Sequence, residues 1–148
     1  KVIQKLKNSF GDKAVLYSNY NLEILSKKQV LIIDTIGLLT KLYHYAAVAY
    51  IGGGMGTKGL HNTLEAAVFG VPIIIGKNYD RFPEAKAMLA QGGLVSVQDT
   101  SSFKKSLDSF VEDEDFRHVC GQKNKAYIDK NKGATALITE KILTEITM

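Results

Sequence analysis

The chain has 148 residues, 45% of them apolar, which suits one domain of ordinary size with a real core. Its 19 lysines and arginines exceed its 15 aspartates and glutamates by four, and this excess lies entirely within residues 1–28. Seventeen of the cations are lysines, whereas proteins that read nucleic acid spread a basic surface and rely on arginine. The single cysteine, Cys120, excludes a disulfide framework and a multi-cysteine metal site. We therefore expect a soluble domain with no nucleic-acid partner, no cofactor and no metal.

Short apolar runs in the first two thirds of the chain predict β-strands. The expected strands are Val15–Asn19, Val30–Asp34, Val48–Ile51, Pro72–Ile75 and Leu94–Val97. Three of them contain uninterrupted apolar residues, at positions 30–33, 48–51 and 73–75. Runs of this kind are typical of a parallel sheet that helices cover on both faces.

Helical patterns lie between these strands and fill the chain after residue 100. The expected helices are Lys1–Phe10, Gly37–Tyr45, Thr63–Phe69, Phe82–Gln91, Ser101–Val111, Glu114–Lys130 and Ala134–Ile146. Residues 20–29 suit either a very short crossover helix or a loop. Because strand and helix alternate through the middle of the chain, the pattern predicts an α/β fold with a doubly wound parallel sheet. The sheet should end near Val97, leaving an all-helical final third in which Cys120 is a small buried hydrophobic residue.

The most informative segment follows the third expected strand. Five of the thirteen glycines fall within eight residues there, at positions 52, 53, 54, 56 and 59. Missing side chains let backbone N–H groups approach a ligand closely, and the start of the next helix adds partial positive charge, so the segment favours a phosphate ligand. The alternative is a turn whose glycines are needed only for positive φ values.

The spacing of these glycines does not identify a particular cofactor. Gly54, Gly56 and Gly59 match the G-x-G-x-x-G spelling of a dinucleotide fold, but the next strand is not followed directly by the acidic residue that this motif requires. A phosphate-binding P-loop is excluded because Asn78 follows Gly76 and Lys77 where serine or threonine is required.

Polar residues near this loop have both structural and functional interpretations. Asn62 followed three residues later by Glu65 is the spacing of a helix capping box, although Glu65 beside the loop could also accept hydrogen bonds from a ribose diol. His61 is a phosphate donor or a packing residue. Asp34 and Thr35 end a strand at the edge where open α/β sheets bind ligands, and Asp34 could equally cap the next helix. Lys77, Tyr79 and Arg81 follow the fourth strand and either reach a ligand or only solubilise a loop.

Four motifs in a fixed order carry a resemblance to a known family. They are Asp34-Thr35-Ile36-Gly37, Gly52-Gly53-Gly54, His61-Asn62-Thr63-Leu64-Glu65 and Gly70-Val71-Pro72. In this order and spacing the chain resembles the 3-deoxy-D-manno-octulosonic acid (Kdo) transferases of lipopolysaccharide synthesis. It departs from the usual pattern at Leu38, where the family has an acid, and at Gly54-Met55-Gly56-Thr57, where many members have S-L-V-P.

The resemblance implies a two-domain glycosyltransferase of the GT-B type. This chain would be its single, incomplete carboxy-terminal domain, a Rossmann-like parallel sheet flanked by helices that binds the nucleotide-sugar donor CMP-Kdo. The amino-terminal acceptor domain, which holds the general base, would lie outside the chain, so that this fragment alone is inactive. The full enzyme would transfer Kdo to a lipid A precursor at the cytoplasmic face of the bacterial inner membrane.

The same resemblance implies donor-binding residues but no catalytic residue and no metal ligand in this chain. The expected donor site contains Gly52, Gly53, Gly54, Met55, Gly56, His61, Asn62, Glu65, Asp34 and Thr35. The glycine loop and Asn62 would meet the phosphate and sugar side of CMP-Kdo, and Glu65 would hold the ribose. Two other interpretations stay open, namely the donor domain of a UDP-sugar transferase or epimerase and a non-catalytic nucleotide-binding domain.

Overall fold

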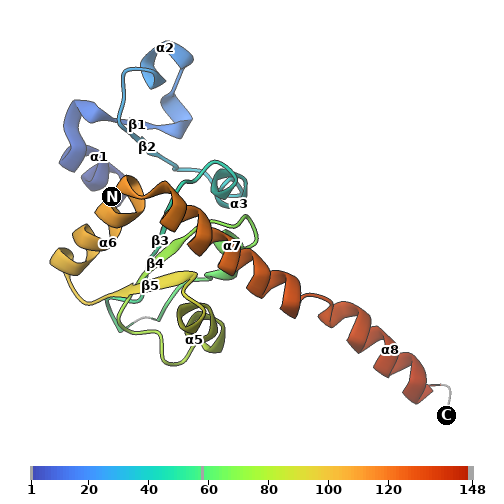
Figure 1. Ribbon diagram of the computed structural model, residues 1–148. Helices are drawn as coiled ribbons and strands as arrows, with labels where there is room; N and C mark the ends of the chain where they lie inside the picture. Colours follow the sequence, from blue (N-terminus) through green and yellow to red (C-terminus); the bar gives the residue numbers. More distant parts are fainter. Residues whose placement is uncertain (1, 58, 147–148) are drawn as a thin grey trace. The chain divides into compact units, whose positions relative to one another are not determined.

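The computed structural model describes residues 2–57 and 59–146. The chain divides into two compact units, Lys1–Leu42 and Tyr43–Met148. Each unit has its own parallel β-sheet, with strands β1 and β2 in the first and strands β3, β4 and β5 in the second (Figure 1). The α/β class predicted from the sequence is therefore confirmed, but the strands form two sheets instead of one.

The first unit combines one amphipathic helix with a two-stranded sheet. Helix α1 (Val2–Phe10) and a 3₁₀ turn (Gly11–Lys13) lead into β1 (Ala14–Leu16). Strand β1 pairs in parallel with β2 (Val30–Ile32), so that Ala14 lies opposite Val30. The connection contains a second 3₁₀ turn (Tyr17–Asn19) and a single-turn helix, α2 (Leu22–Leu25).

Both strands of this unit are shorter than the sequence predicts. The expected strands ended at Asn19 and Asp34, whereas the observed ones end at Leu16 and Ile32. Beyond the ladder, the N–H and hydroxyl groups of Ser18 donate to the carboxylate of Asp34, at 3.0 and 2.6 Å. The ladder stops early because these side-chain bonds replace strand pairing.

The second unit has three parallel strands in the order β3-β4-β5. The strands are β3 (Ala49–Ile51), β4 (Ile73–Gly76) and β5 (Leu94–Val97), and their connections contain α4 (Leu64–Ala67) and α5 (Pro83–Ala90). Helix α3 (Leu39–Tyr43) precedes β3 and spans the boundary between the units. The predicted single sheet is wrong at this point, because β2 and β3 are not paired with each other.

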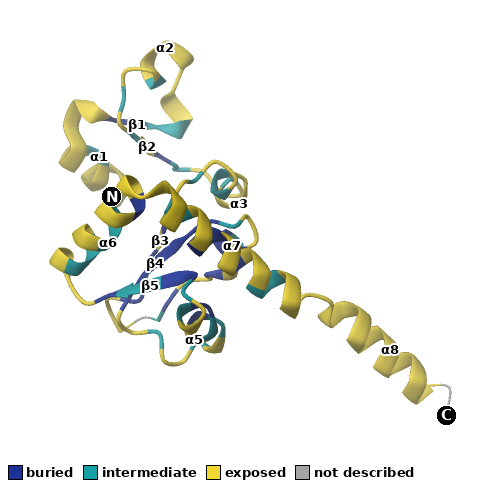
Figure 2. Cartoon of the chain, in the orientation of Figure 1, coloured by how far each residue is buried: buried dark blue, intermediate teal, exposed yellow. Residues whose placement is uncertain are grey.

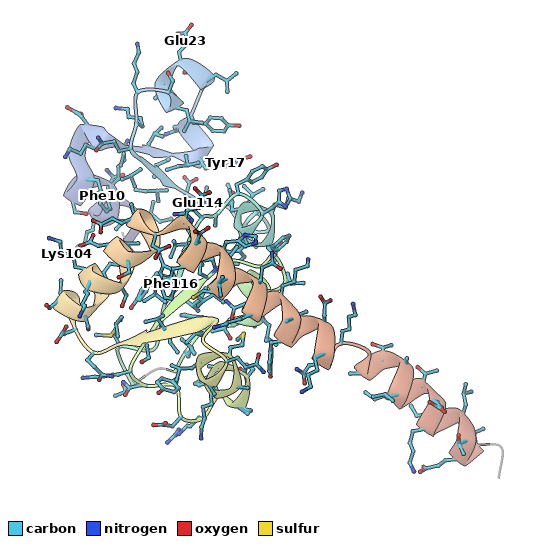
Figure 3. All side chains as sticks on the ribbon, in the orientation of Figure 1. Phe10, Tyr17, Glu23, Lys104, Glu114 and Phe116 are labelled. Carbon is cyan, nitrogen blue, oxygen red and sulfur yellow. The ribbon has the colours of Figure 1, made fainter. Side chains whose placement is uncertain are left out.

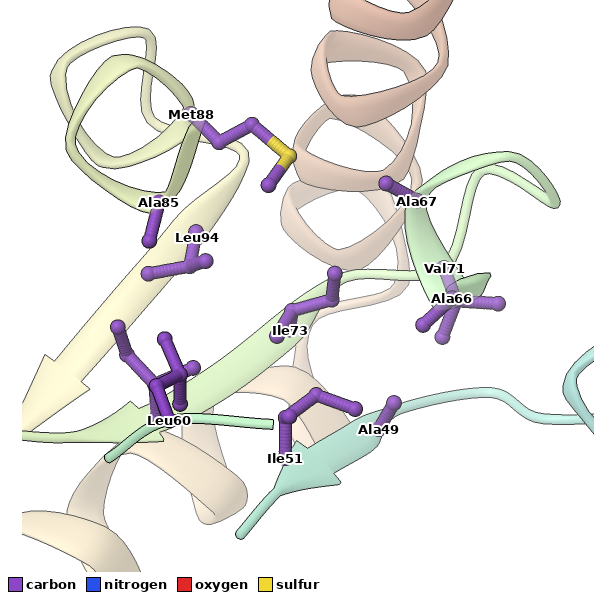
Figure 4. Close-up of a cluster of buried hydrophobic side chains, with 11 residues drawn as sticks. Ala49, Ile51, Leu60, Ala66, Ala67, Val71, Ile73, Ala85, Met88 and Leu94 are labelled. Atoms are coloured by element: carbon purple, nitrogen blue, oxygen red, sulfur yellow. The ribbon is translucent and has the colours of Figure 1, made fainter. Parts of the chain in front are cut away.

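The core of the second unit lies around β4. Ile73, Ile74 and Ile75 are completely buried, and because strand side chains alternate, they face opposite sides of the sheet. Ile73 and Ile75 pack with residues of α4 and α5 such as Ala66 and Met88 (Figure 4). The prediction of burial on both faces is correct for β4 but wrong for the other two runs, where Leu31 and Tyr50 are exposed.

Helices cover the other face of this sheet and form the whole final part of the chain, as expected. Helix α6 (Thr100–Glu112) and helix α7 (Glu114–Asn131) contribute Phe110 and Cys120 to a second cluster around Ile74. The ring of Phe116, which is labelled in Figure 3, stacks on that of Phe110 with 5.1 Å between the two centroids. The expectation that Cys120 is a buried hydrophobic residue is confirmed, and burial raises the pKa of its thiol.

One buried amide, which the sequence gives no reason to single out, attaches α7 to the sheet. The side-chain NH₂ of Asn124 donates to the carbonyls of Val71 and Gly93, at 2.8 and 2.7 Å. Val71 lies just before β4 and Gly93 just before β5, so that one side chain satisfies the carbonyls leading into both strands. Buried carbonyls without such partners would be costly.

Helix α8 (Ala134–Ile146) ends the described chain and has no buried residue, as its exposed colouring in Figure 2 shows. Its apolar side chains, including Leu137 and Ile138, are more than half exposed. Within the described residues, no helix combines the length and the hydrophobicity needed to cross a bilayer.

Candidate functional site

The glycine segment leaves β3 and turns against the end of β4. Gly54 is buried and Met55 is exposed at this turn. A Cβ placed on Gly76, the last residue of β4, would lie 2.3 Å from the carbonyl carbon of Gly54 and 2.4 Å from the nitrogen of Met55. The loop is therefore fixed at the carboxyl ends of two adjacent parallel strands, where open α/β sheets bind ligands.

The loop glycines have two different physical roles. Gly53 has a φ of +91°, and a Cβ on it would lie 2.0 Å from the carbonyl oxygen of Gly59, while a Cβ on Gly54 would meet the backbone of Gly76 at 3.0 Å. These two positions need glycine for internal packing. Gly56, in contrast, faces open space, and a Cβ on Gly52 would meet only the His61 ring, at 3.7 Å. Of Gly52, Gly53, Gly54 and Gly56, the first and the last thus leave room beside the loop.

Asn78, which sequence reasoning did not select, holds the loop in place. Its backbone N–H donates to the carbonyl of Gly54 at 2.8 Å, and its side-chain NH₂ donates to the carbonyl of Gly56 at 2.9 Å. None of the hydrogen bonds in the described part of the chain uses the N–H groups of Gly54 or Met55. With the carbonyls fixed and these two donors unused, the loop suits an anion better than a cation.

His61 lies directly beside this loop, as predicted. Its N–H donates to the carbonyl of Gly52 at 3.1 Å. Its ring carbon Cδ2 lies 3.2 Å from the position that a Cβ on Gly53 would take, so that the exposed imidazole covers the glycine backbone. The structure therefore brings His61 and the glycine loop together.

Asn62 and Glu65 form a pair, but not the capping box that their spacing indicates. In a capping box the Glu65 carboxylate would accept from the backbone N–H of Asn62. Instead it accepts from the side-chain NH₂ of Asn62 at 3.1 Å, and the Asn62 carbonyl oxygen accepts from the N–H of Leu64 at 3.0 Å. Asn62 stands one residue too early because α4 begins at Leu64, after Thr63. The Asn62 amide thus positions the Glu65 carboxylate at the edge of the site.

The helix that follows this segment is shorter than predicted. The partial positive charge that we expected at its start is therefore small. Helix α4 spans only Leu64–Ala67, against the expected Thr63–Phe69. A single turn adds few aligned peptide dipoles. Anion binding at this loop therefore has to come from the loop N–H groups and not from a helix terminus.

Tyr43 lies close enough to Glu65 to respond to its charge. Burial raises the pKa of the Tyr43 hydroxyl, and the Glu65 carboxylate raises it further. The sequence analysis does not select this residue, which lies inside the expected helix Gly37–Tyr45. Both effects favour the protonated form of the Tyr43 hydroxyl.

Asp34 and Thr35 belong to the other compact unit, Lys1–Leu42. The two bonds from Ser18 lower the pKa of Asp34, with the hydroxyl bond making the largest contribution. The structure thus gives Asp34 a structural role at the end of the small sheet, and it does not cap a helix. Thr35 is exposed.

A cavity of about 520 Å³ adjoins the glycine segment. Its walls are Gly56, Thr57 and Gly59 on one side and Asn78, Asp80, Arg81 and Phe82, from the loop after β4, on the other. Lys77 and Tyr79 do not line it, so Arg81 is the member of that candidate trio that does. In the described residues no cluster of histidine, cysteine and acidic side chains could hold a metal ion.

Several of the known proteins that are similar in sequence to the chain share one name. No model of a protein family matches the chain. The chain is 30% identical over 108 residues to a 3-deoxy-D-manno-octulosonic acid transferase of Haemophilus influenzae, a match that covers 72% of this chain and 25% of that protein. It is 29% identical over 93 residues to the enzyme of the same name from Aquifex aeolicus, covering 63% of this chain and 25% of that protein.

A solved structure supplies the corresponding fold. The chain matches the C-terminal CMP-Kdo binding domain of WaaA from Acinetobacter baumannii with a TM-score of 0.74 and 18% identity, over 84% of this chain and 65% of that chain. The chain spans about a quarter of the length of the curated relatives it matches. It therefore belongs to the 3-deoxy-D-manno-octulosonic acid transferase family and has the fold of that family's carboxy-terminal domain.

Proposed function

We propose that this chain binds the nucleotide sugar CMP-Kdo as the donor domain of a Kdo transferase. The observation that carries the proposal is the arrangement of the glycine loop, His61 and the Asn62–Glu65 pair, which lie along one continuous segment at the carboxyl edge of the sheet. Family membership and the name of the solved domain support the same donor.

The proposed contacts follow from the chemistry of each group. The N–H groups of Gly54 and Met55 would donate to the phosphate, with Gly52 and Gly56 leaving space for it and His61 as a further donor. The Glu65 carboxylate, held by Asn62, would accept from the ribose hydroxyls, because an ionised carboxylate is a strong bidentate acceptor.

Asp34 and Thr35 belong to the proposal through the family motif alone. The Asp34 carboxylate already accepts two hydrogen bonds from Ser18. Thr35 is exposed and has the more available side chain of the two.

The activity of the full enzyme is part of the same proposal. A complete Kdo transferase would add an acceptor domain that carries the general base, and would transfer Kdo to a lipid A precursor at the cytoplasmic face of the bacterial inner membrane. This chain alone would bind the donor without transferring its sugar.

Isothermal titration calorimetry tests the proposal directly. The chain is titrated separately with CMP, UMP, UDP and NAD under identical conditions. We expect measurable binding of CMP and at least tenfold weaker binding of the other three. UMP carries a carbonyl oxygen in place of the 4-amino group of cytosine, and UDP and NAD carry two phosphates where this donor has one.

The control ligands also separate the alternative functions. A preference for UDP would favour a UDP-sugar transferase or epimerase, and a preference for NAD would favour a dinucleotide enzyme. Either result would contradict the proposal, as would the absence of binding to all four nucleotides.

A further inference from the structure

The cavity beside the glycine segment has room for the sugar of the donor. Its volume, about 520 Å³, lies within the range of small-molecule sites. It shares Gly56 with the loop proposed to hold the phosphate, so the two sites are contiguous. The cavity therefore adjoins the place proposed for the phosphate.

The walls of the cavity are held by specific contacts. The side chain of Asn78 bonds to the carbonyl of Gly56, which joins the two loops that form the walls. The ring of Phe82 lies against Gly59, whose Cβ position would be 3.4 Å from the ring atom Cζ. Gly59 has a φ of +91°, which other residues rarely adopt, so this wall depends on glycine.

One cationic and one anionic side chain line the cavity, and they do not form an ion pair with each other. Arg81 and Asp80 are adjacent in sequence and exposed, and no salt bridge joins either of them to another described residue. The Arg81 guanidinium offers several N–H donors in a planar fork, which matches a carboxylate. The Asp80 carboxylate accepts hydrogen bonds, which matches hydroxyl groups.

We propose that this cavity is the subsite for an acidic sugar, and that Arg81 recognises its carboxylate while Asp80 accepts hydrogen bonds from its hydroxyls. The inference rests on the proposed function and adds the residue that distinguishes an acidic sugar from a neutral one. Phe82 supplies the apolar surface on which the carbon skeleton of a sugar can pack. Thr57 supplies a further hydroxyl beside the shared Gly56.

The test compares two ligands that differ only by the sugar. CMP and freshly prepared CMP-Kdo are titrated into the wild-type chain and into the Arg81→Gln, Arg81→Lys and Lys104→Gln variants. Lys104→Gln is the matched control, because it removes one exposed positive charge from α6, outside the cavity (Figure 3). Melting temperatures of all variants are measured in parallel.

We expect Arg81→Gln to weaken CMP-Kdo binding about tenfold or more while leaving CMP binding unchanged, since only the intact donor carries the carboxylate. Arg81→Lys should recover part of the loss, because lysine keeps the charge but not the fork. Lys104→Gln should change neither affinity. A CMP-Kdo analogue with a carboxamide in place of the carboxylate should bind wild type and Arg81→Gln with similar affinity.

The failures of the two proposals are distinguishable. If wild type binds both ligands and Arg81→Gln binds CMP-Kdo as well as wild type does, the subsite is overturned and the donor function stands. If Arg81→Gln loses CMP and CMP-Kdo equally, Arg81 acts on the nucleotide or on folding, and the subsite is again overturned. If wild type binds neither ligand, the donor function fails and the subsite fails with it.

Discussion

At the scale of single residues, Glu65 is the side chain whose two interpretations can be separated most sharply. Its carboxylate accepts from the Asn62 side chain at 3.1 Å and bonds to no backbone N–H group of the described residues. A glutamine at this position keeps an oxygen that can accept the same bond. The structural role would therefore survive the substitution, whereas a ribose-binding role needs the negative charge.

We predict that Glu65→Gln weakens CMP binding about tenfold and changes the free energy of unfolding by no more than about 0.5 kcal/mol. Titration calorimetry and thermal unfolding measure the two effects on the same samples. Glu84→Gln is the matched control, because Glu84 also lies in the first turn of a helix, α5. Equal losses of binding and stability in Glu65→Gln would instead indicate a structural role.

Asp34 provides a prediction that depends on pH. Its pKa is lowered, chiefly by the hydroxyl of Ser18. Since the folded pKa lies below the unfolded one, the stabilising contribution is fully present above the unfolded pKa and is lost as the pH falls through the folded pKa.

Ser18→Ala should raise the pKa of Asp34 part of the way to its ordinary value, because the backbone N–H of Ser18 still donates. Carboxyl-carbon NMR titration of the wild type and the variant measures this shift. The first unit of the variant should consequently lose its stability at a higher pH on acidification. An unchanged Asp34 pKa would mean that the hydroxyl bond does not form in solution.

At the scale of elements, the glycine loop combines positions needed for packing with positions left open. A Cβ on Gly54 would lie 3.0–3.2 Å from backbone atoms of Gly76, whereas a Cβ on Gly56 would meet nothing within 4 Å. Substitution by alanine should therefore affect stability at Gly54 but not at Gly56.

We predict that Gly54→Ala lowers the free energy of unfolding by about 1–3 kcal/mol, as overpacking against a backbone does. Gly56→Ala should leave it within about 0.5 kcal/mol of wild type while weakening CMP binding, since its methyl group occupies the ligand side of the loop. Urea denaturation and titration calorimetry of both variants provide the comparison. A strongly destabilised Gly56→Ala would show that this glycine, too, is structural.

Across the second unit as a whole, the buried residues lie in the sheet and in the elements packed against it. The last helix, α8, contributes none of them. Ile74 of β4 is completely buried against the helices α6 and α7, while no residue of α8 is buried. Removing a buried side chain leaves a cavity, but removing an exposed helix exposes little new surface.

Deletion of residues 134–148 should therefore leave the urea midpoint of the second unit nearly unchanged. Ile74→Ala, as the reference for a core change, should cost about 2–5 kcal/mol. Circular dichroism during urea denaturation measures both. A large loss of stability on deletion would contradict the burial pattern of α8.

The α/β class, the places of most helices and strands, the all-helical end and the ordered motifs that point to one family can all be predicted from the sequence. It could do so because these features depend on local periodicity, on glycine spacing and on neighbours a few residues apart. His61 beside the loop and Cys120 in the core were predictable for the same reason.

Which glycines pack and which leave space can be seen only in the folded chain, because Gly53 and Gly54 are constrained by Gly59 and Gly76, which lie further along the sequence. Likewise, Asn78 and Asn124 act on backbone groups 22 to 53 residues away, and the division of the strands into two sheets depends on long-range pairing. A one-residue difference in the start of α4 turned a predicted capping box into a side-chain pair. Contacts between distant residues leave no periodic signal in the sequence, so these features required the folded chain.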